Sequence, residues 1–191
     1  MVFGYDVEAS LTSTAQLVNT LAELSDSGDD ELKTLTQLDD FTRENRYSGV
    51  RTRTQAELDG VRAIREPLRA LWAAGSEEEV VDLVNGMLRE TRALPQLVRH
   101  GPWGWHLHAT ADDTPFADRI LVESAMAWVD VIRSEERDRM RICAADDCEA
   151  VLVDFSRNRS KRYCDVGNCG NRANVAAYRA RQAGRDENQL A

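Results

Sequence analysis

The sequence lacks any apolar run near the roughly 20 residues that a membrane-spanning helix requires. Its first residues also lack the charged and then apolar pattern of a secretion signal. We therefore expect the chain in the cytoplasm and not in a membrane or outside the cell. A length of 191 residues is enough for one medium-sized domain with a real core and a second, smaller one.

Sequence motifs of the common enzyme classes are missing as well. There is no P-loop, no G-x-S-x-G, no glycine motif for a dinucleotide and no H-E-x-x-H. Acidic residues are numerous, but they lie on predicted helices in the pattern of solvated faces. We therefore expect that the protein is not an enzyme.

Cysteine is scarce, and its placement is the most specific signal in the chain. The four cysteines form two pairs, Cys143-x4-Cys148 and Cys164-x4-Cys169, with fifteen residues between the pairs. Without a secretion signal, this spacing indicates a four-thiolate zinc site instead of disulfides, because each short turn supplies two tetrahedral ligands. Such a site has no open position for a catalytic water. Four reduced structural thiols are the alternative.

The residues around the cysteines predict a small finger. Residues 150–155 are typical of a strand, 156–160 of a turn and 161–163 of a returning strand. After Cys169 the sequence favours a helix to about Gln182, and the polar tail 184–191 is expected to fray. The order of knuckle, hairpin and helix resembles a treble-clef zinc finger.

The rest of the chain predicts a helical domain. Apolar residues keep helical spacing in five stretches: 11–24, 32–47, 54–74, 76–89 and 115–139. Pro67 should split or kink the third of these helices, and Thr114 followed by Pro115 should start the last one. The charged end of this last helix, 135–141, is expected to be exposed.

Capping residues are predicted where three of these helices begin. Thr54 and Ser76 are each followed three residues later by glutamate, which is the pattern of a capping box. Asp29 or Asp30 is placed to cap the helix that follows the first polar loop.

A small strand pair is predicted at residues 96–99 and 103–110, on either side of a turn. In the second strand the side chains of Trp103, Trp105 and Leu107 share one face, and those of His106 and His108 share the other. We expect the tryptophans in the core. The two histidines allow a metal hypothesis, but no third ligand is evident nearby, and partial exposure or hydrogen bonding explains them as well.

Charge is distributed unevenly along the chain. The formal net charge of −9 argues against nucleic-acid binding, but residues 141–185 hold nine Lys or Arg and five Asp or Glu. Basic residues crowd on the predicted hairpin tip and the following helix, where they are candidates for nucleic-acid contact: Arg157, Arg159, Lys161, Arg162, Arg172, Arg179 and Arg181. An ordinary solvated face is the alternative for this run of charges.

The same segment carries a family resemblance. Residues 169–172 spell CGNR, and 143–181 resembles the CGNR zinc finger of bacterial proteins in its x4 knuckle, its strand ending in Asp154, its Ser156-Arg157 turn and its Tyr163-Cys164 pair. Such fingers usually follow a helical ABATE domain, a family described as stress-induced transcription regulators. The stretch 17–20 and the helical layout of this chain are similar to that domain.

The resemblance to ABATE domains implies a pocket for a small ligand or a protein partner in the helical part. Asn19 is the polar residue that we single out for it, because it lies within the matching stretch 17–20. A buried asparagine that is hydrogen-bonded to the backbone is the alternative.

We therefore predict a mainly α protein, with a helical ABATE-like domain at 1–139 that includes the small strand pair, and a treble-clef-like zinc finger at 140–183. The predicted function is a zinc-dependent, DNA-binding transcription regulator whose helical domain is a sensor or dimerisation body. The alternative is a zinc-stabilised protein-interaction module without nucleic-acid binding. One exposed basic face on the finger would favour the regulator, and arginines paired with acidic residues of the body would favour the interaction module.

Overall fold

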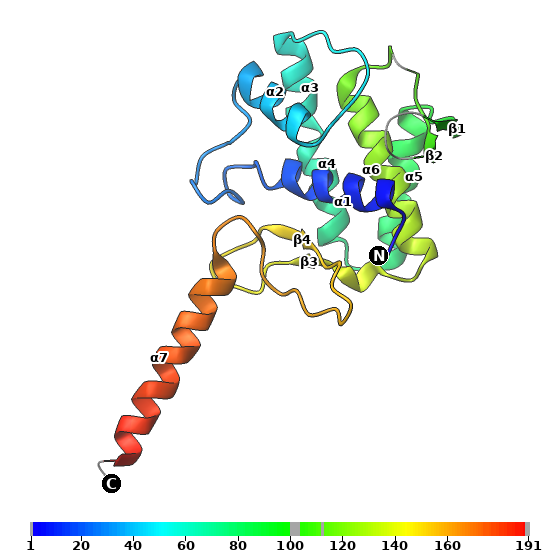
Figure 1. Cartoon of the computed structure of the whole chain (residues 1–191). Coiled ribbons are helices and arrows are strands. Elements are labelled where there is room, and N and C mark those ends of the chain that lie inside the picture. The colour runs from blue at the N-terminus through cyan, green and yellow to red at the C-terminus, as the bar shows by residue number, and fades with distance from the viewer. Residues whose placement is uncertain (1, 100–103, 112, 190–191) are drawn as a thin grey trace.

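The computed structural model describes residues 2–99, 104–111 and 113–189, the last seven of them for the backbone alone. The helices are α1 (Tyr5–Val18), α2 (Leu35–Glu44), α3 (Gln55–Ala63), α4 (Arg65–Ala73), α5 (Glu77–Glu90), α6 (Phe116–Arg133) and α7 (Cys169–Gln189), with a 3-10 turn at Arg137–Arg139. The antiparallel strand pairs are β1 (Gln96–Arg99) with β2 (Trp105–His108), and β3 (Met140–Ile142) with β4 (Val151–Val153). The expected mainly α fold with small strand pairs is confirmed (Figure 1).

Helix α6 lies at the centre of the helical part and packs against α1, α3 and α5. Its buried face carries Ile120, Trp128 and Val131 at helical spacing, which is why the sequence pattern predicts it. The ring of Trp128 meets the ring of Trp72 from α4 edge to face, with 5.1 Å between the ring centroids. The core of the helical part is therefore built around α6. No helix in the described ranges combines the length and the apolar character needed to span a membrane.

The predicted split at Pro67 is confirmed. The chain leaves the helix at Ile64, between α3 and α4. Proline has no N–H to donate to the carbonyl four residues earlier, so the helical ladder is interrupted there.

Helix caps agree with the sequence in part. The side chains of Thr54 and Ser76 cap α3 and α5 as predicted. Neither predicted capping box is complete, because the Glu57 carboxylate accepts from the N–H of Thr52 and the Glu79 carboxylate from that of Gly75. The prediction for Asp29 or Asp30 is wrong, because Thr34 caps α2 in a complete capping box. The Asp30 carboxylate instead accepts hydrogen bonds from the guanidinium of Arg65 at 2.8 Å.

The strand pair β1–β2 forms as predicted, but its buried face is the opposite one. Trp105 is 68% exposed, whereas His106 is only 8% exposed. The side of β2 that carries the histidines faces the helices, and the side that carries Trp105 faces solvent. The expectation that Trp105 belongs to the core is therefore wrong. Trp103 lies outside the described residues.

Helix α6 is shorter than predicted. Pro115 occupies the N-cap position itself, without a side-chain cap from Thr114, and the helix ends at Arg133 instead of continuing to Arg139. Glu135 has a φ of 56°, which is left-handed and incompatible with a continuing helix. Arg139 is buried and donates to the carbonyl oxygens of Asp154 and Ser156, so the expected exposure of this charged segment is wrong for Arg139.

Strand β4 pairs with β3 and not with residues 161–163. Met140 lies opposite Val153, and Ile142 lies opposite Val151. The segment 161–163 has no strand assignment, and the buried carboxylate of Asp154 accepts from the N–H groups of Ser156 and Lys161, closing the intervening loop on itself. The predicted hairpin between 150–155 and 161–163 therefore does not form. Instead, β3 and β4 form a hairpin, and the turn between them contains Cys143 and Cys148.

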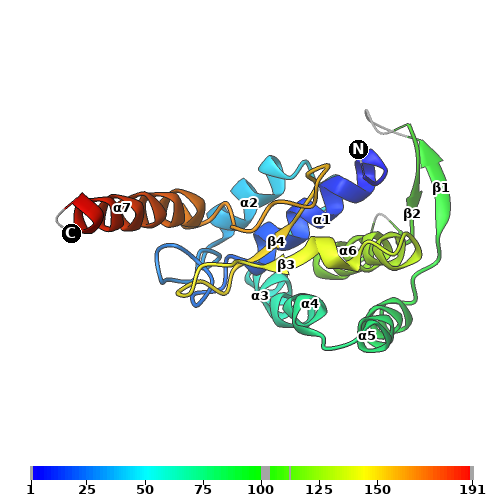
Figure 2. The same cartoon turned by 90° about the horizontal axis from the view of Figure 1, so that it is seen from below.

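Helix α7 begins at Cys169 and continues to Gln189, beyond the end predicted near Gln182. It points away from the helical part and from β3–β4 (Figures 1 and 2). Its first residue is one of the four cysteines, so the position of α7 depends on the cysteine cluster.

Candidate metal centre and nucleic-acid interface

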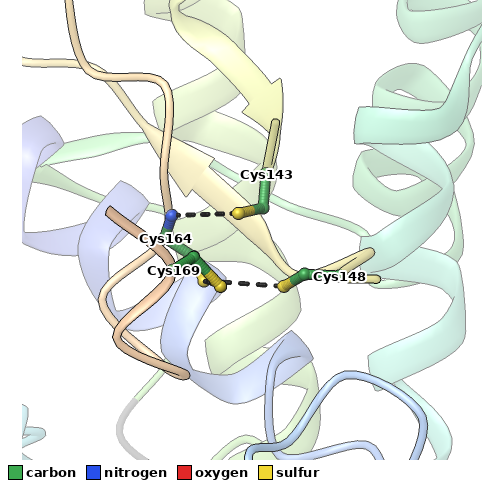
Figure 3. A group of neighbouring side chains, drawn as sticks. All are labelled: Cys143, Cys148, Cys164 and Cys169. Atoms are coloured by element: carbon green, nitrogen blue, oxygen red, sulfur yellow. Dashed lines mark hydrogen bonds between the residues drawn. The ribbon is translucent and has the colours of Figure 1, made fainter. Parts of the chain in front are cut away.

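The four cysteines come from four separate backbone positions that the finger brings together. Cys143 follows β3, Cys148 lies in the turn before β4, Cys164 lies in the loop after it and Cys169 begins α7. Their sulfur atoms all lie within 4.8 Å of one another (Figure 3). Cys143, Cys164 and Cys169 are buried, and Cys148 is partly buried.

The spacing of the sulfur atoms fits a four-thiolate metal centre. Cys148 Sγ lies 3.6 Å from Cys164 Sγ, which in turn lies 3.7 Å from Cys169 Sγ. A tetrahedron with zinc–sulfur bonds of about 2.3 Å has sulfur–sulfur edges of about 3.8 Å. A disulfide would bring two sulfur atoms to about 2.05 Å. The arrangement therefore fits a tetrahedral cation and excludes disulfide pairing of these cysteines.

Burial makes the cluster costly to ionise in the absence of a cation. Burial, together with the three neighbouring thiols, raises the pKa of the Cys148 thiol to about 12. A coordinated cation reverses this preference, because it stabilises the thiolate form of each ligand. Metal binding at this site must therefore displace protons.

Arg172 of the CGNR motif lies directly beside the cysteine cluster. Its Nη2 donates to Cys169 Sγ at 3.1 Å, and its Nη1 pairs with the Asp147 carboxylate at 2.6 Å. Because Asp147 lies in the turn between Cys143 and Cys148, this guanidinium links the two halves of the cluster. Sequence reasoning assigned Arg172 to DNA contact and missed this role, although the spacing Cys169-x-x-Arg172 places both side chains on one face of α7.

Backbone geometry explains the second cysteine loop. Asn168 has a φ of 52°, in the left-handed region that asparagine tolerates. A Cβ on Gly167 would lie 2.9 Å from the Asp26 carboxylate and 3.6 Å from Cys169 Sγ. The small residue therefore lets this loop pass between the cysteines and the helical part.

The seven basic candidate residues do not form one uninterrupted basic surface. Arg159 pairs with Glu136 and Asp138, Lys161 pairs with Asp165, and Arg172 pairs with Asp147. The other four are exposed, and no carboxylate of the described side chains lies within 4.0 Å of them: Arg157, Arg162, Arg179 and Arg181. Two of the free arginines, Arg179 and Arg181, lie on α7 and two lie on the preceding loop.

Another arginine, which the sequence did not single out, organises that loop. Arg141 of β3 donates to the carbonyl oxygens of Arg159 and Lys161 and lies 3.2 Å from the buried Asp154 carboxylate. This position could not be deduced from spacing, since its partners lie 13 to 20 residues further along the chain.

Asn19 joins the helical part to the finger. Its Nδ2 donates to the carbonyl oxygen of Val151, and its Oδ1 accepts from the N–H of the same residue, both at 2.9 Å. Asn19 also lies on the wall of a cleft of about 680 Å³ between α1, α2 and β4. Both hydrogen-bonding groups of its amide are therefore engaged with β4. This is the arrangement of the alternative interpretation of Asn19, a buried asparagine that is hydrogen-bonded to the backbone.

His106 and His108 lie with ring centroids 5.0 Å apart, on the wall of a separate cavity in the helical part. His106 Nδ1 donates to the carbonyl oxygen of Gly104 at 3.0 Å. Among the described residues, only the four cysteines bring together three or more ligands of the kind that hold a metal. The metal hypothesis for the histidines thus gains no further ligand from the structure.

The fold and the cysteine cluster define a helical protein with a metal centre of the zinc-finger type at the base of an exposed helix. Residues 139–182 match the CGNR zinc finger family. Residues 14–135, more than half of the chain, match the ABATE family, described as "Putative stress-induced transcription regulator", and the chain belongs to this family. A search of curated proteins returned no match.

Proposed function

We propose that the protein is a zinc-dependent transcription regulator that binds DNA with α7. One observation carries the proposal: α7 begins at a cysteine of the metal centre and extends away from the rest of the chain (Figure 1), and its arginines between Cys169 and Gln182 are exposed. Between Cys169 and Gln182 this helix contains three arginines and no acidic residue. The major groove of DNA admits an α-helix of this kind.

Zinc has a structural role in the proposal. Cys143, Cys148, Cys164 and Cys169 would hold the ion, and its coordination would supply folding free energy to a segment with little core of its own. Four thiolates leave no position for a reacting water, so we propose no catalytic step. Such a regulator would act in the cytoplasm, where its cysteines stay reduced.

Electrostatics limit the number of DNA contacts. The guanidinium of Arg172 is already engaged with Asp147 and Cys169, which leaves Arg179 and Arg181 on α7 with Arg157 and Arg162 on the loop. Each phosphate that a basic side chain neutralises contributes about −0.9 to the slope of log affinity against log salt. We therefore expect a slope of roughly −3 to −4.

The test is the binding of the zinc-loaded full chain to duplex DNA of random sequence over a range of salt concentrations. Arg179→Ala and Arg181→Ala should each weaken binding and flatten the slope by about one unit if they contact phosphate. Arg89→Ala is the matched control, because Arg89 is exposed on α5, away from α7. If the folded, zinc-loaded chain binds no duplex at low salt, the DNA-binding proposal fails.

The second candidate function is a zinc-stabilised protein-interaction module. It is favoured by Val175 and Tyr178, which are 40% and 56% exposed on α7, and by the pairing of Arg159, Lys161 and Arg172 with acidic residues of the same chain. An exposed apolar stripe on a projecting helix can pack against a partner helix. Concentration-dependent association that Val175→Ser and Tyr178→Ser abolish, without any DNA binding, would support this function.

A further inference from the structure

The helical part contains a cavity of about 130 Å³ that is separate from the metal centre. It lies between α1, the segment that follows α2, strand β2 and α6. Its lining combines three carboxylates, Asp6, Glu123 and Asp130, with the phenol of Tyr47 and the imidazole of His106. The mixture of acidic, hydrogen-bonding and apolar groups is typical of a ligand site more than of a packing defect.

Glu123 is the chemically distinctive residue of this cavity. Its carboxylate forms no hydrogen bond and no ion pair with the described residues. Burial raises the pKa of Glu123 to about 7, although the charge of Arg119 acts in the opposite direction. A carboxylate in such a place is stabilised by any cation that enters the cavity.

Arg119, one turn earlier on α6, is not available as that cation. Its guanidinium donates to the carbonyl oxygens of Ser48 and Val50 and lies 5.2 Å from the centroid of the Phe116 ring. These contacts hold the loop after α2 against α6. The positive charge of Arg119 is therefore committed to a structural role outside the cavity.

The other carboxylates add to the negative character of the site. Burial raises the pKa of Asp130, the charge of Arg133 acts in the opposite direction, and the nearby Asp6 raises it by like-charge repulsion. Arg46 is the basic residue of the lining, and its side chain is exposed. The lining thus contains three carboxylates, one exposed arginine and two histidines. This excess of acidic groups favours a cationic ligand over an anionic one.

We propose that this cavity binds a small organic cation, namely an amine with a compact apolar body. The ammonium group would lie against Glu123, and the apolar body against Val7, Val122 and Met126. A cavity of about 150 Å³ lined by apolar side chains holds benzene, so a space of this size takes a ligand of comparable volume. This ligand would bind the helical part independently of the proposed DNA binding, and the experiment that tests it uses no DNA.

The site is placed to influence the finger. Helix α1 lines the cavity through Ser10 and Ser13, and Asn19, the C-cap residue of the same helix, is hydrogen-bonded to β4. A ligand that stabilises one position of α1 would therefore also stabilise the position of β4 and of the finger that contains it.

The experiment compares three probes of nearly equal size and different charge: benzylamine, benzyl alcohol and benzoate. Each is titrated into the zinc-loaded full chain and followed by two-dimensional NMR and by the melting temperature. We expect benzylamine to bind and to raise the melting temperature, and Glu123→Gln to weaken its binding by about tenfold or more through loss of a charge-assisted hydrogen bond. Asp82→Asn, which removes an exposed carboxylate of α5 outside the cavity, should leave binding unchanged.

A second variant keeps the charge of Glu123 and blocks the space. Ser10→Leu places a larger side chain at the cavity wall, and the Ser10 hydroxyl makes no hydrogen bond with the described residues that would be lost. It should abolish benzylamine binding. The proposal is overturned if benzoate binds as well as benzylamine, if Glu123→Gln or Ser10→Leu binds benzylamine like the unmodified protein, or if none of the probes binds.

The pH dependence has a defined sign. Benzylamine binding should strengthen as the pH rises through about 7, because Glu123 then loses its proton. The other charged or titratable groups around the cavity are Asp6, Asp130, Arg46, His106 and His108, and burial keeps Tyr47 protonated by raising its pKa. Glu123→Gln should lose most of this dependence, and an unchanged pH profile in that variant would also contradict the proposal.

Discussion

Among single residues, Asn19 makes the most consequential contact between the two halves of the chain. Its amide satisfies both the N–H and the carbonyl oxygen of Val151, and it is itself 9% exposed. In this way a side chain takes the place of a neighbouring strand at the free edge of β4. Both backbone groups lie in a buried environment, where unpaired polar groups are costly.

We expect Asn19→Ala to destabilise the protein by roughly 2–4 kcal/mol, because it leaves two buried backbone groups without a partner. Urea unfolding of the zinc-loaded chain measures this loss. Asn174→Ala, at an exposed position of α7, is the control and should change the free energy of unfolding by no more than about 0.5 kcal/mol. A cost for Asn19→Ala as small as that of the control would show that water replaces the amide.

The residue scale also shows what spacing can and cannot predict. The cysteine cluster follows from two x4 turns, because close pairs converge whatever the rest of the chain does. The pairing of Arg159 with Glu136 and Asp138 depends on how the loop after β4 folds back, and no local pattern encodes it. The unpartnered carboxylate of Glu123 was likewise invisible, since on the sequence it is one of many acidic residues on a helix.

Among the elements, β4 was predicted from the sequence, but the strand that pairs with it was not. Its hydrophobic residues were recognised as a strand, but its partner was not, because β3 is only three residues long and follows a charged segment. Val151 and Val153 enter the core of the helical part, whereas Leu152 packs against the cysteines. This alternation reflects the period of two along a strand, and it places β4 between two hydrophobic clusters.

At this scale the metal centre should decide whether the finger is ordered. We expect Cys164→Ser to lose zinc and to unfold the segment around the cysteines, because the metal supplies most of the folding free energy of so small a unit. Elemental analysis of protein prepared without chelator measures the zinc, and NMR of the α7 backbone reports its order. The helical part should keep its circular dichroism signal.

Val166→Ala, in the same loop as Cys164 but not a ligand, is the control and should retain zinc. One zinc per chain in Cys164→Ser, or no zinc in the unmodified protein, would contradict a four-thiolate site.

In the whole molecule, contacts cross the boundary that the sequence places between residues 139 and 140. Trp72 donates its indole N–H to the carbonyl oxygen of Leu152 at 3.1 Å, and Arg69 pairs with Glu149 at 2.9 Å. Two valines of β4 complete the core around α1 and α4. The independent folding of residues 1–139 remains a prediction, and these contacts indicate what the fragment would lose.

Truncation after residue 139 tests this dependence. We expect the fragment 1–139 to remain helical, because α6 and the helices around it bury a core of their own. Loss of Val151 and Val153 should nevertheless lower its free energy of unfolding by about 3–6 kcal/mol, at roughly 1.5–3 kcal/mol for each buried valine. Urea unfolding, followed by the fluorescence of the buried Trp72 and Trp128, measures the difference.

The full chain treated with chelator is the control that separates the effect of the metal from that of β4. If β4 remains docked without zinc, the chelated chain should be more stable than the fragment. A fragment as stable as the intact zinc-loaded chain would mean that the finger is only tethered, and a fragment without cooperative unfolding would move the boundary of the helical domain beyond β4.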